Sequence, residues 1–144
     1  HWFRNEHKLE IGAQTAEQIK ITVGSAMRSR SKNILVKGRD LVSGIPKTID
    51  VRSDEIRQAL KDPVKRILDV IKDALEATPA ELSSDIIDRG IVLAGGGSQL
   101  RGLDQVLREK TGVPVNVADE PHLAIVKGCG AVIEDLEKFK HVLL

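Results

Sequence analysis

The spacing of apolar residues divides the 144-residue chain into a first part with a helix and a hairpin and a second part of alternating strands and helices. Apolar residues at three- and four-residue spacing predict an amphipathic helix over residues 13–24 that ends at Gly24. The residues of this stripe are Ala16, Ile19 and Val23. Two β-rich runs follow, 33–40 and 46–53, and the polar turn between them contains Gly44. We therefore expect a β-hairpin with one exposed face.

A longer apolar stripe follows the hairpin and predicts helical structure. Its members, all three or four residues apart, are Ile56, Leu60, Val64, Ile67, Ile71 and Leu75. Ser53 is a predicted N-cap. Pro63 interrupts the stripe, and a proline ring clashes with the carbonyl four residues earlier. The sequence thus predicts two helices, 53–61 and 63–77, with a domain boundary between them.

The remaining pattern is typical of a parallel βαβ unit. A short helix over 79–85 is expected to deliver Ile86 and Ile87 to the core. The rest reads as strand, glycine loop, helix, strand and helix, at residues 90–94, 95–99, 100–112, 113–118 and 121–139. The apolar first strand predicts a central, buried position, and the crossover between the two strands should be right-handed.

Composition excludes several classes of function. Lys and Arg total 22 against 21 Asp and Glu, and the chain has two Phe, one Trp and no Tyr, which disfavours a nucleic-acid partner. Cys129 is the single cysteine, and no His or Cys cluster has metal-ligand spacing, so we expect no disulfide, no metal site and a cytoplasmic location. No apolar run approaches the roughly 20 residues that span a bilayer. The start lacks a Met and resembles the end of a helix, which suggests a piece of a longer chain.

The three consecutive glycines Gly95, Gly96 and Gly97 are the main candidate ligand site. They follow a predicted strand, where open α/β sheets bind ligands, and without Cβ atoms they allow a close approach to the backbone. A strand-to-helix turn without a ligand is the alternative. The phosphate-binding loop G-x-x-x-x-G-K-[ST] is absent, and Leu100 stands where the dinucleotide fingerprint G-x-G-x-x-G has its third glycine. Both of those motifs are therefore disfavoured.

Three segments together resemble the second half of the MreB family, bacterial actin homologues that direct rod shape. They are "IGAQTAEQIKITVGSA", "VKGRDLVSGIPKTIDVRSDEIRQAL" and "IVLAGGGSQLRGLD", and the similarity runs from about Leu9 to about Glu137. The glycine loop alone is shared with sugar kinases and Hsp70-type chaperones. The hairpin segment, in contrast, resembles the MreB family and not those other proteins.

The resemblance implies an α/β, actin-like ATPase (ribonuclease H-like) fold, of which this chain is the second large domain only. Residues 1–62, with the helix and the hairpin, would form its small outer lobe. Residues 63–144 would form the C-terminal part of its inner lobe, including the glycine-rich nucleotide loop.

The resemblance also implies an ATP site. Glu17, Gln18, Ile19 and Lys20 match the family's helix against adenine and ribose, where Glu17 can accept from ribose hydroxyls and Lys20 can donate. The loop under the nucleoside and its first phosphate would consist of Gly95, Gly96, Gly97, Ser98, Gln99 and Leu100. The alternative for Glu17 and Lys20 is a solvated surface ion pair.

The family's phosphate-binding hairpins, metal-associated aspartates and water-positioning residues would all precede position 1. No catalytic residue is therefore assigned, Mg²⁺ is expected only with that other part, and this chain alone should not hydrolyse ATP. Ala13 stands where the family often has an acidic residue. Residues 127–130 resemble a small-residue stretch of the family's last helix that packs near the adenine base. We expect close packing to explain its two glycines, and Cys129 to be a small buried hydrophobic residue.

Two functional hypotheses of different classes remain, with a dinucleotide-dependent enzyme a distant third. The first is a fragment of an ATP-binding, filament-forming cytoskeletal protein that determines rod shape by organising cell-wall synthesis. The second is a nucleotide-independent assembly module. Expected partners are other copies in a protofilament and proteins of cell shape and cell-wall synthesis, with membrane association of the polymerised full-length protein through other regions. An incomplete sheet should also expose strand edges, which predicts dimerisation or strand exchange of the isolated chain.

Overall fold

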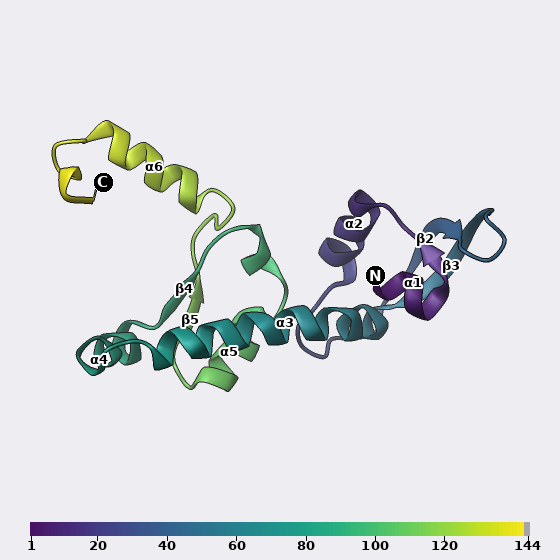
Figure 1. Ribbon diagram of the computed structural model, residues 1–144, viewed down its shortest axis with the longest axis horizontal. Helices are drawn as coiled ribbons and strands as arrows, with labels where there is room; N and C mark the ends of the chain where they lie inside the picture. Colours follow the sequence, from purple (N-terminus) through teal and green to yellow (C-terminus); the bar gives the residue numbers. More distant parts are fainter. Residues whose placement is uncertain (143–144) are drawn as a thin grey trace.

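The computed structural model describes residues 1–142, which form an elongated mixed α/β molecule (Figure 1). Its elements, in chain order, are α1 (Trp2–His7), β1 (Leu9–Glu10), α2 (Ala13–Val23), β2 (Asn33–Asp40), β3 (Pro46–Arg52), α3 (Ser53–Glu76), α4 (Ala80–Arg89), β4 (Ile91–Leu93), the 3₁₀ helix η1 (Gly96–Gln99), α5 (Leu103–Thr111), β5 (Val115–Val117), α6 (Ala124–Glu134) and the 3₁₀ helix η2 (Lys140–Val142). Buried side chains form two hydrophobic clusters, one toward each end of α3.

The first cluster joins an antiparallel sheet of order β1-β2-β3 to α2 and the start of α3. The predicted hairpin is confirmed, with Val36 paired to Ile49 and Ile34 paired to Val51. The buried members are Leu9, Ile19, Val23, Val36, Val51 and Ile56. Strand β1 has only two residues, too few to produce a period-2 pattern, and the sequence analysis did not predict it. Ala16 proves exposed, so the stripe of α2 is narrower than its spacing suggested.

Helix α3 is continuous across Pro63, so the prediction of two helices was wrong. Proline inside a helix costs about 3 kcal/mol, because it lacks an N–H and its ring crowds the preceding turn. Here the positions on both sides are held by packing: Leu60 contacts the first cluster, and Val64 is buried in the second. Pro63 itself is exposed. Burial along two cores therefore outweighs the local penalty.

The second cluster lies between α3, α5 and the parallel pair β4-β5. The predicted helix after the glycine loop is confirmed: Leu103 and Leu107 are buried, and the helix ends at Gly112 in the left-handed conformation. The pair β4-β5 forms a sheet of two strands only, so both outer edges are free among the described residues, as predicted.

Three burial predictions in this part were wrong. Val92, in the strand expected to be buried, is 64% exposed, and Ile87 is also 64% exposed on α4, which continues to Arg89. Helix α6 buries none of its residues, Cys129 is exposed, and a Cβ at Gly128 or Gly130 would meet no atom within 4 Å. Figure 1 shows α6 extending away from the other elements. These apolar side chains have the composition of a core, but no described element covers them.

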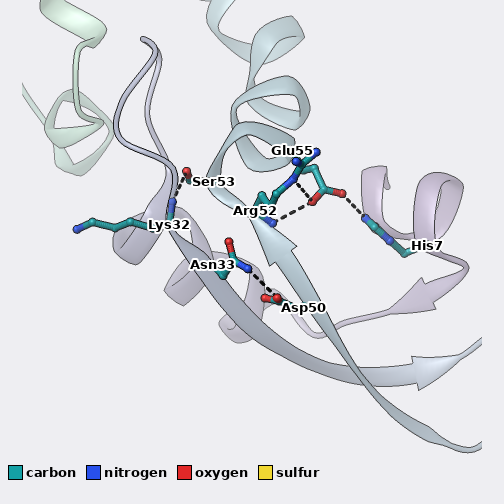
Figure 2. A network of polar contacts seen from close by, with 7 residues as sticks. All are labelled: His7, Lys32, Asn33, Asp50, Arg52, Ser53 and Glu55. Atoms are coloured by element: carbon teal, nitrogen blue, oxygen red, sulfur yellow. Dashed lines mark hydrogen bonds and ion pairs between the residues drawn. The ribbon is translucent and has the colours of Figure 1, made fainter.

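A network of polar contacts fixes the start of α3 against the hairpin and α1 (Figure 2). The predicted N-cap was one residue late: Arg52 is the N-cap, and its N–H donates to Glu55 Oε2 at 2.9 Å. Ser53 Oγ instead accepts from the Lys32 N–H at 3.1 Å, while the Ser53 N–H donates to the Lys32 carbonyl. His7 Nε2 lies 3.2 Å from Glu55 Oε1. The first turn of α3 is thus bonded to the loop before β2 and to α1.

Asp40 organises the hairpin turn. Its Oδ1 accepts from the N–H groups of Val42 and Ser43 at 2.8 and 2.9 Å, and its Oδ2 accepts from Lys47 Nζ at 2.8 Å. The bond from Lys47, followed by those from the backbone, holds the pKa of the Asp40 carboxyl well below its ordinary value. The ionised carboxylate is therefore part of the folded turn.

We predict that Pro63→Ala raises the free energy of unfolding by about 1–3 kcal/mol, because alanine restores the helical N–H and removes the ring. Urea unfolding followed by circular dichroism at 222 nm measures it. Pro79→Ala is the matched control, since Pro79 is the N-cap of α4 and lies outside the helix, where its missing N–H breaks no intrahelical hydrogen bond. Equal stability of wild type and Pro63→Ala would show that the helix pays no penalty at this position.

We predict that Asp40→Asn lowers the urea midpoint at pH 7 and flattens its dependence on acid pH. The folded carboxyl keeps its charge where the unfolded one takes up a proton, so its stabilisation is complete above about pH 4 and is lost as pH falls further. Urea titrations at several values between about pH 6 and pH 2.5 measure this. Asp50→Asn removes a carboxylate from the same hairpin as a control; a profile of Asp40→Asn parallel to wild type would contradict the prediction.

Candidate functional site

The first group of predicted ligand residues lies on α2. Glu17 and Lys20 form an ion pair, with 2.6 Å between Nζ and Oε2, and their side chains are 54% and 39% exposed. Gln18 is exposed as well. Ile19 is 4% exposed and belongs to the first hydrophobic cluster. Three of the four positions therefore present side chains to solvent, while Ile19 fixes the helix to its core.

A cavity of about 750 Å³ lies beside Glu17 and Lys20. Its walls come from α1, α2 and α3, and on α2 they include the small residues Ala13 and Ala16. Apolar side chains such as Leu9 and Ile56 line it as well. The glycine loop contributes no residue to this cavity, so the two predicted groups of ligand residues do not share it.

The glycine loop itself is compact and leaves space beside its backbone. Gly95 has φ +83° and donates its N–H to the Pro121 carbonyl at 2.6 Å. Gly96 and Gly97 begin η1, and among residues 1–142 their N–H groups have no hydrogen-bond acceptor. A Cβ on any of the three would meet no atom within 4 Å. Glycine is thus required by φ only at Gly95, and at the other two it leaves open space over free donors.

The end of the loop is occupied by internal contacts. Ser98 is buried, and its hydroxyl donates to the Gly95 carbonyl at 2.7 Å. Gln99 Nε2 lies 3.2 Å from His122 Nδ1, and Leu100 packs against the second cluster. Ser98 and Leu100 therefore shape the loop, and the open groups are the N–H groups of Gly96 and Gly97.

Arg101, which the sequence analysis did not single out, connects the loop to α2. Its Nε donates to the Gly24 carbonyl at 3.1 Å and its Nη2 to the Thr22 carbonyl at 2.9 Å. Its own carbonyl accepts from the Ala26 N–H at 2.8 Å and from Ser25 Oγ at 3.2 Å. An arginine that neutralises the carboxyl end of a helix is favourable. The residue after the glycine loop thus ties it to the end of the helix that carries Glu17 and Lys20.

The following glycine completes this connection. Gly102 has φ +73°, and a Cβ there would come within 3.0 Å of Met27 Cγ. The pair Arg101-Gly102 was visible in the sequence, but an arginine contacting carbonyls 77 and 79 residues away leaves no local pattern. Only the fold reveals that this pair joins the two groups of predicted ligand residues.

The polar groups at these positions are of types that bind hydroxyls and phosphates. One cation, one carboxylate and two free N–H groups are available, a set suited to hydroxyls and phosphate or ring acceptors. Within the described part of the chain, no group of three or more His, Cys, Asp or Glu could hold a metal ion. The resolved pKa shifts lie in the hairpin region: Arg39, then Arg4, lowers the pKa of Glu10, as Lys47 does for Asp40.

The family model and the curated relatives that match this chain are all described as MreB or Mbl proteins. The family model described as MreB/Mbl protein matches residues 1–141. The cell shape-determining protein Mbl of Bacillus subtilis is 45% identical over 96% of this chain and 42% of its own length. The cell shape-determining protein MreB of Escherichia coli K12 is 41% identical over 95% of this chain and 40% of its own length. The chain therefore spans about two fifths of the curated relatives it matches.

Solved structures of the same family are similar to this chain. The crystal structure of MreB 5 of Spiroplasma citri bound to AMPPNP has a TM-score of 0.89 at 31% identity, covering 99% of this chain and 43% of that one. The ADP-bound structure of MreB5 from the same organism has a TM-score of 0.90. A MamK double helical filament, 22% identical with a TM-score of 0.64, shares the fold.

The fold is thus the actin-like ATPase fold that the resemblance implied. None of the helices within residues 1–142 has the length and apolar character needed to cross a membrane. The match of the family model along nearly the whole chain, the curated relatives and the ATPase fold lead to one conclusion. The chain belongs to the MreB/Mbl family of actin-like proteins.

Proposed function

We propose that this chain supplies the nucleoside-facing walls of an ATP site in a filament-forming, cell shape-determining protein. The observation that carries the proposal is the connection through Arg101, which ties the glycine loop to the helix of Glu17 and Lys20. Relatives of the same fold have been solved with AMPPNP and with ADP. A structural turn would need neither the tie to α2 nor the free donors of Gly96 and Gly97.

The residues of both walls fit a nucleoside with its first phosphate. The Glu17 carboxylate suits ribose hydroxyls, and the Lys20 ammonium suits a ring nitrogen or hydroxyl. The N–H groups of Gly96 and Gly97 suit phosphate or ribose oxygens, with no side chain in the way. The backbone of α2 is held in place by Ile19, and that of the glycine loop by Ser98 and Leu100. Gln18 and Gln99 would lie at the edge of the proposed nucleotide site. Bound ATP would supply the phosphoryl group, whose transfer depends on parts of the protein outside this chain.

The proposed division of the chain follows the two hydrophobic clusters. Residues 1–62 would be the outer lobe of the second actin-like domain, and 63–144 the C-terminal part of its inner lobe. The change of cluster between Leu60 and Val64 supports this boundary, although α3 continues through it. The free edges of β4 and β5 and the uncovered α6 are the surfaces on which the rest of an inner lobe would pack.

The assembled protein would polymerise into protofilaments and act with proteins of cell shape and cell-wall synthesis. The names of the relatives, which are cell shape-determining proteins, support this role, and the filament formed by MamK supports self-association of the fold. Mg²⁺ would bind with ATP through residues outside this chain. We place the protein in the cytoplasm, with membrane association of the polymer through regions outside residues 1–144.

We predict that Lys20→Ala weakens nucleotide binding about tenfold or more, because a charged hydrogen bond contributes about 1.5–3 kcal/mol. The measurement is fluorescence titration of a labelled ATP analogue into this chain joined to the upstream half of an MreB relative. Lys37→Ala, at an exposed lysine of β2, is the matched control and should bind as wild type does. Equal affinities for both variants would remove Lys20 from the site.

We predict that Gly96→Val abolishes ATP-dependent polymerisation of the same joined protein, while Gly96→Ala reduces it partly. A Cβ at Gly96 meets no atom of this chain within 4 Å, so we expect the loss to come from exclusion of the ligand. Pelleting and light scattering with and without ATP measure polymerisation, and circular dichroism checks the fold. Filaments that ignore both nucleotide and substitution would instead support the nucleotide-independent assembly module.

A further inference from the structure

A second, smaller cavity lies on another side of α3 from the proposed nucleotide walls. It has a volume of about 250 Å³ and lies between α3, α5 and the loop after α2. Its apolar lining consists of Ala26, Leu60, Val64, Leu68 and Val106. The volume is below the roughly 300–1,000 Å³ of typical small-molecule sites. It suits one large apolar side chain.

The other four lining residues are all basic: Arg57, Lys61, Lys65 and Lys110. No acidic residue lines the cavity, although the whole chain carries a net charge of only +1. Of the ion pairs among residues 1–142, the pair of Arg57 with Asp54 is the one that involves this group. Lys61, Lys65 and Lys110 are exposed. Positive charge is therefore concentrated around an apolar hollow, and of the four basic lining residues only Arg57 has an ion-pair partner among residues 1–142.

The spacing on α3 arranges these residues in two parallel rows. Arg57, Lys61 and Lys65 follow one another at intervals of four, as do the apolar Leu60, Val64 and Leu68. Residues four apart lie on the same face of a helix, about 6 Å apart along its axis. Like charges at this spacing destabilise a helix by about 0.2–0.5 kcal/mol per pair. Asp62 and Asp69, three and four residues from Lys65, partly offset this repulsion, and a ligand of opposite charge facing the row would offset it further.

The loop that starts at Ala26, beside the cavity, is also basic. Arg28, Arg30 and Lys32 are exposed, and the loop runs from Ala26, whose N–H is bonded to Arg101, to Lys32, which is bonded to Ser53 at the start of α3. The loop therefore runs from the level of α5 to the first turn of α3. It carries three further cations, none of which lines the cavity itself.

We propose that this surface binds an acidic, amphipathic helical segment of a partner protein. One leucine or phenylalanine of the segment enters the cavity between Leu60, Val64 and Val106. Carboxylates spaced four residues apart lie opposite Arg57, Lys61 and Lys65. The recessed position of the apolar residues, with the cations at the rim, favours a protruding side chain over a membrane surface, which requires protruding apolar groups on the protein. Nucleic acid is disfavoured because no aromatic residue lines the cavity.

The test uses the 144-residue chain and fluorescence anisotropy of a labelled, helix-forming peptide with one central leucine and glutamates at four-residue spacing. We expect saturable binding that weakens as salt rises from about 50 to 300 mM. Replacement of the peptide leucine by alanine should weaken binding at least fivefold, and exchange of its glutamates for lysines should abolish it. A peptide that does not bind, or binds equally well with lysines, would overturn the proposal.

Variants of the chain locate the contact. Lys61→Glu should weaken peptide binding at least tenfold, whereas Lys37→Glu, an equal charge change at an exposed lysine of β2, should leave it unchanged. Ala26→Leu, which fills the cavity, should remove the preference for the leucine peptide over its alanine version; thermal unfolding confirms that each variant is folded. Equal loss with Lys61→Glu and Lys37→Glu would show attraction by net charge only and would overturn the site.

Two alternative occupants give distinct results. Anionic phospholipid vesicles that sediment wild type but not Lys61→Glu, and from which the peptide does not release the chain, would identify a membrane and overturn the proposal. Helix α4 carries Glu81, Asp85 and Asp88 with the exposed Leu82, so a second copy is the other candidate. Light scattering that shows a dimer in wild type and a monomer in Lys61→Glu would assign the surface to self-association instead.

Discussion

The packing of α3 against two separate hydrophobic clusters is the constraint on which the rest of the structure depends. Ile56 and Leu60 hold its first turns to the antiparallel sheet, and Val64 and Leu68 hold the next turns to α5 and β5. Each cluster has few fully buried side chains, namely Leu9, Val36 and Val51 in one and Leu107 and Val115 in the other. Small cores provide limited stabilisation, so a helix shared between them contributes to both. It also sets the position of one cluster relative to the other.

That position determines how the two proposed nucleotide walls, α2 and the glycine loop, lie relative to each other. Helix α2 belongs to the first cluster through Ile19 and Val23, whereas the glycine loop belongs to the second through Leu100. The two walls are therefore built on different cores, and α3, which packs against both, is the first connection between them. Arg101 is the second connection, since it binds carbonyls at the end of α2 from within the glycine-loop segment. The packing of α3 and the hydrogen bonds of Arg101 thus both fix the distance between the two walls.

The elements that the sequence predicted correctly are those stabilised within this chain. The hairpin 33–52 and helix α5 follow from period-2 and period-3.6 patterns because each packs its apolar face on a neighbour that is present. The wrong predictions have two physical origins. At Pro63 the tertiary packing of Leu60 and Val64 overrides a local rule. At Ile87, Val92 and Cys129 the residue types are typical of a core, but no element among the described residues covers them.

The residues of the candidate site also divide into those that could be predicted from the sequence and those that could not. Exposed Glu17 and Lys20 and the open glycine loop could be chosen from the sequence because a resemblance assigns them, and local spacing then agrees. Arg101 could not, because its partners are far away in the chain. Nor does the sequence show which side of α3 faces which cavity. In the structure Gln58, Ala59 and Asp62 line the larger cavity beside Glu17, and Lys61 and Lys65 line the smaller one.

Leu60 is the one α3 residue that lines both cavities, and it packs against the first cluster as well. Leu60 is partly buried, and its side chain forms part of the wall on both sides of α3. A side chain inserted on the basic side of α3 would press on Leu60 from that side, and through it on the wall of the larger cavity next to Glu17 and Lys20. The helix that fixes the two clusters thus also borders, at Leu60, both the proposed partner surface and the cavity beside Glu17 and Lys20.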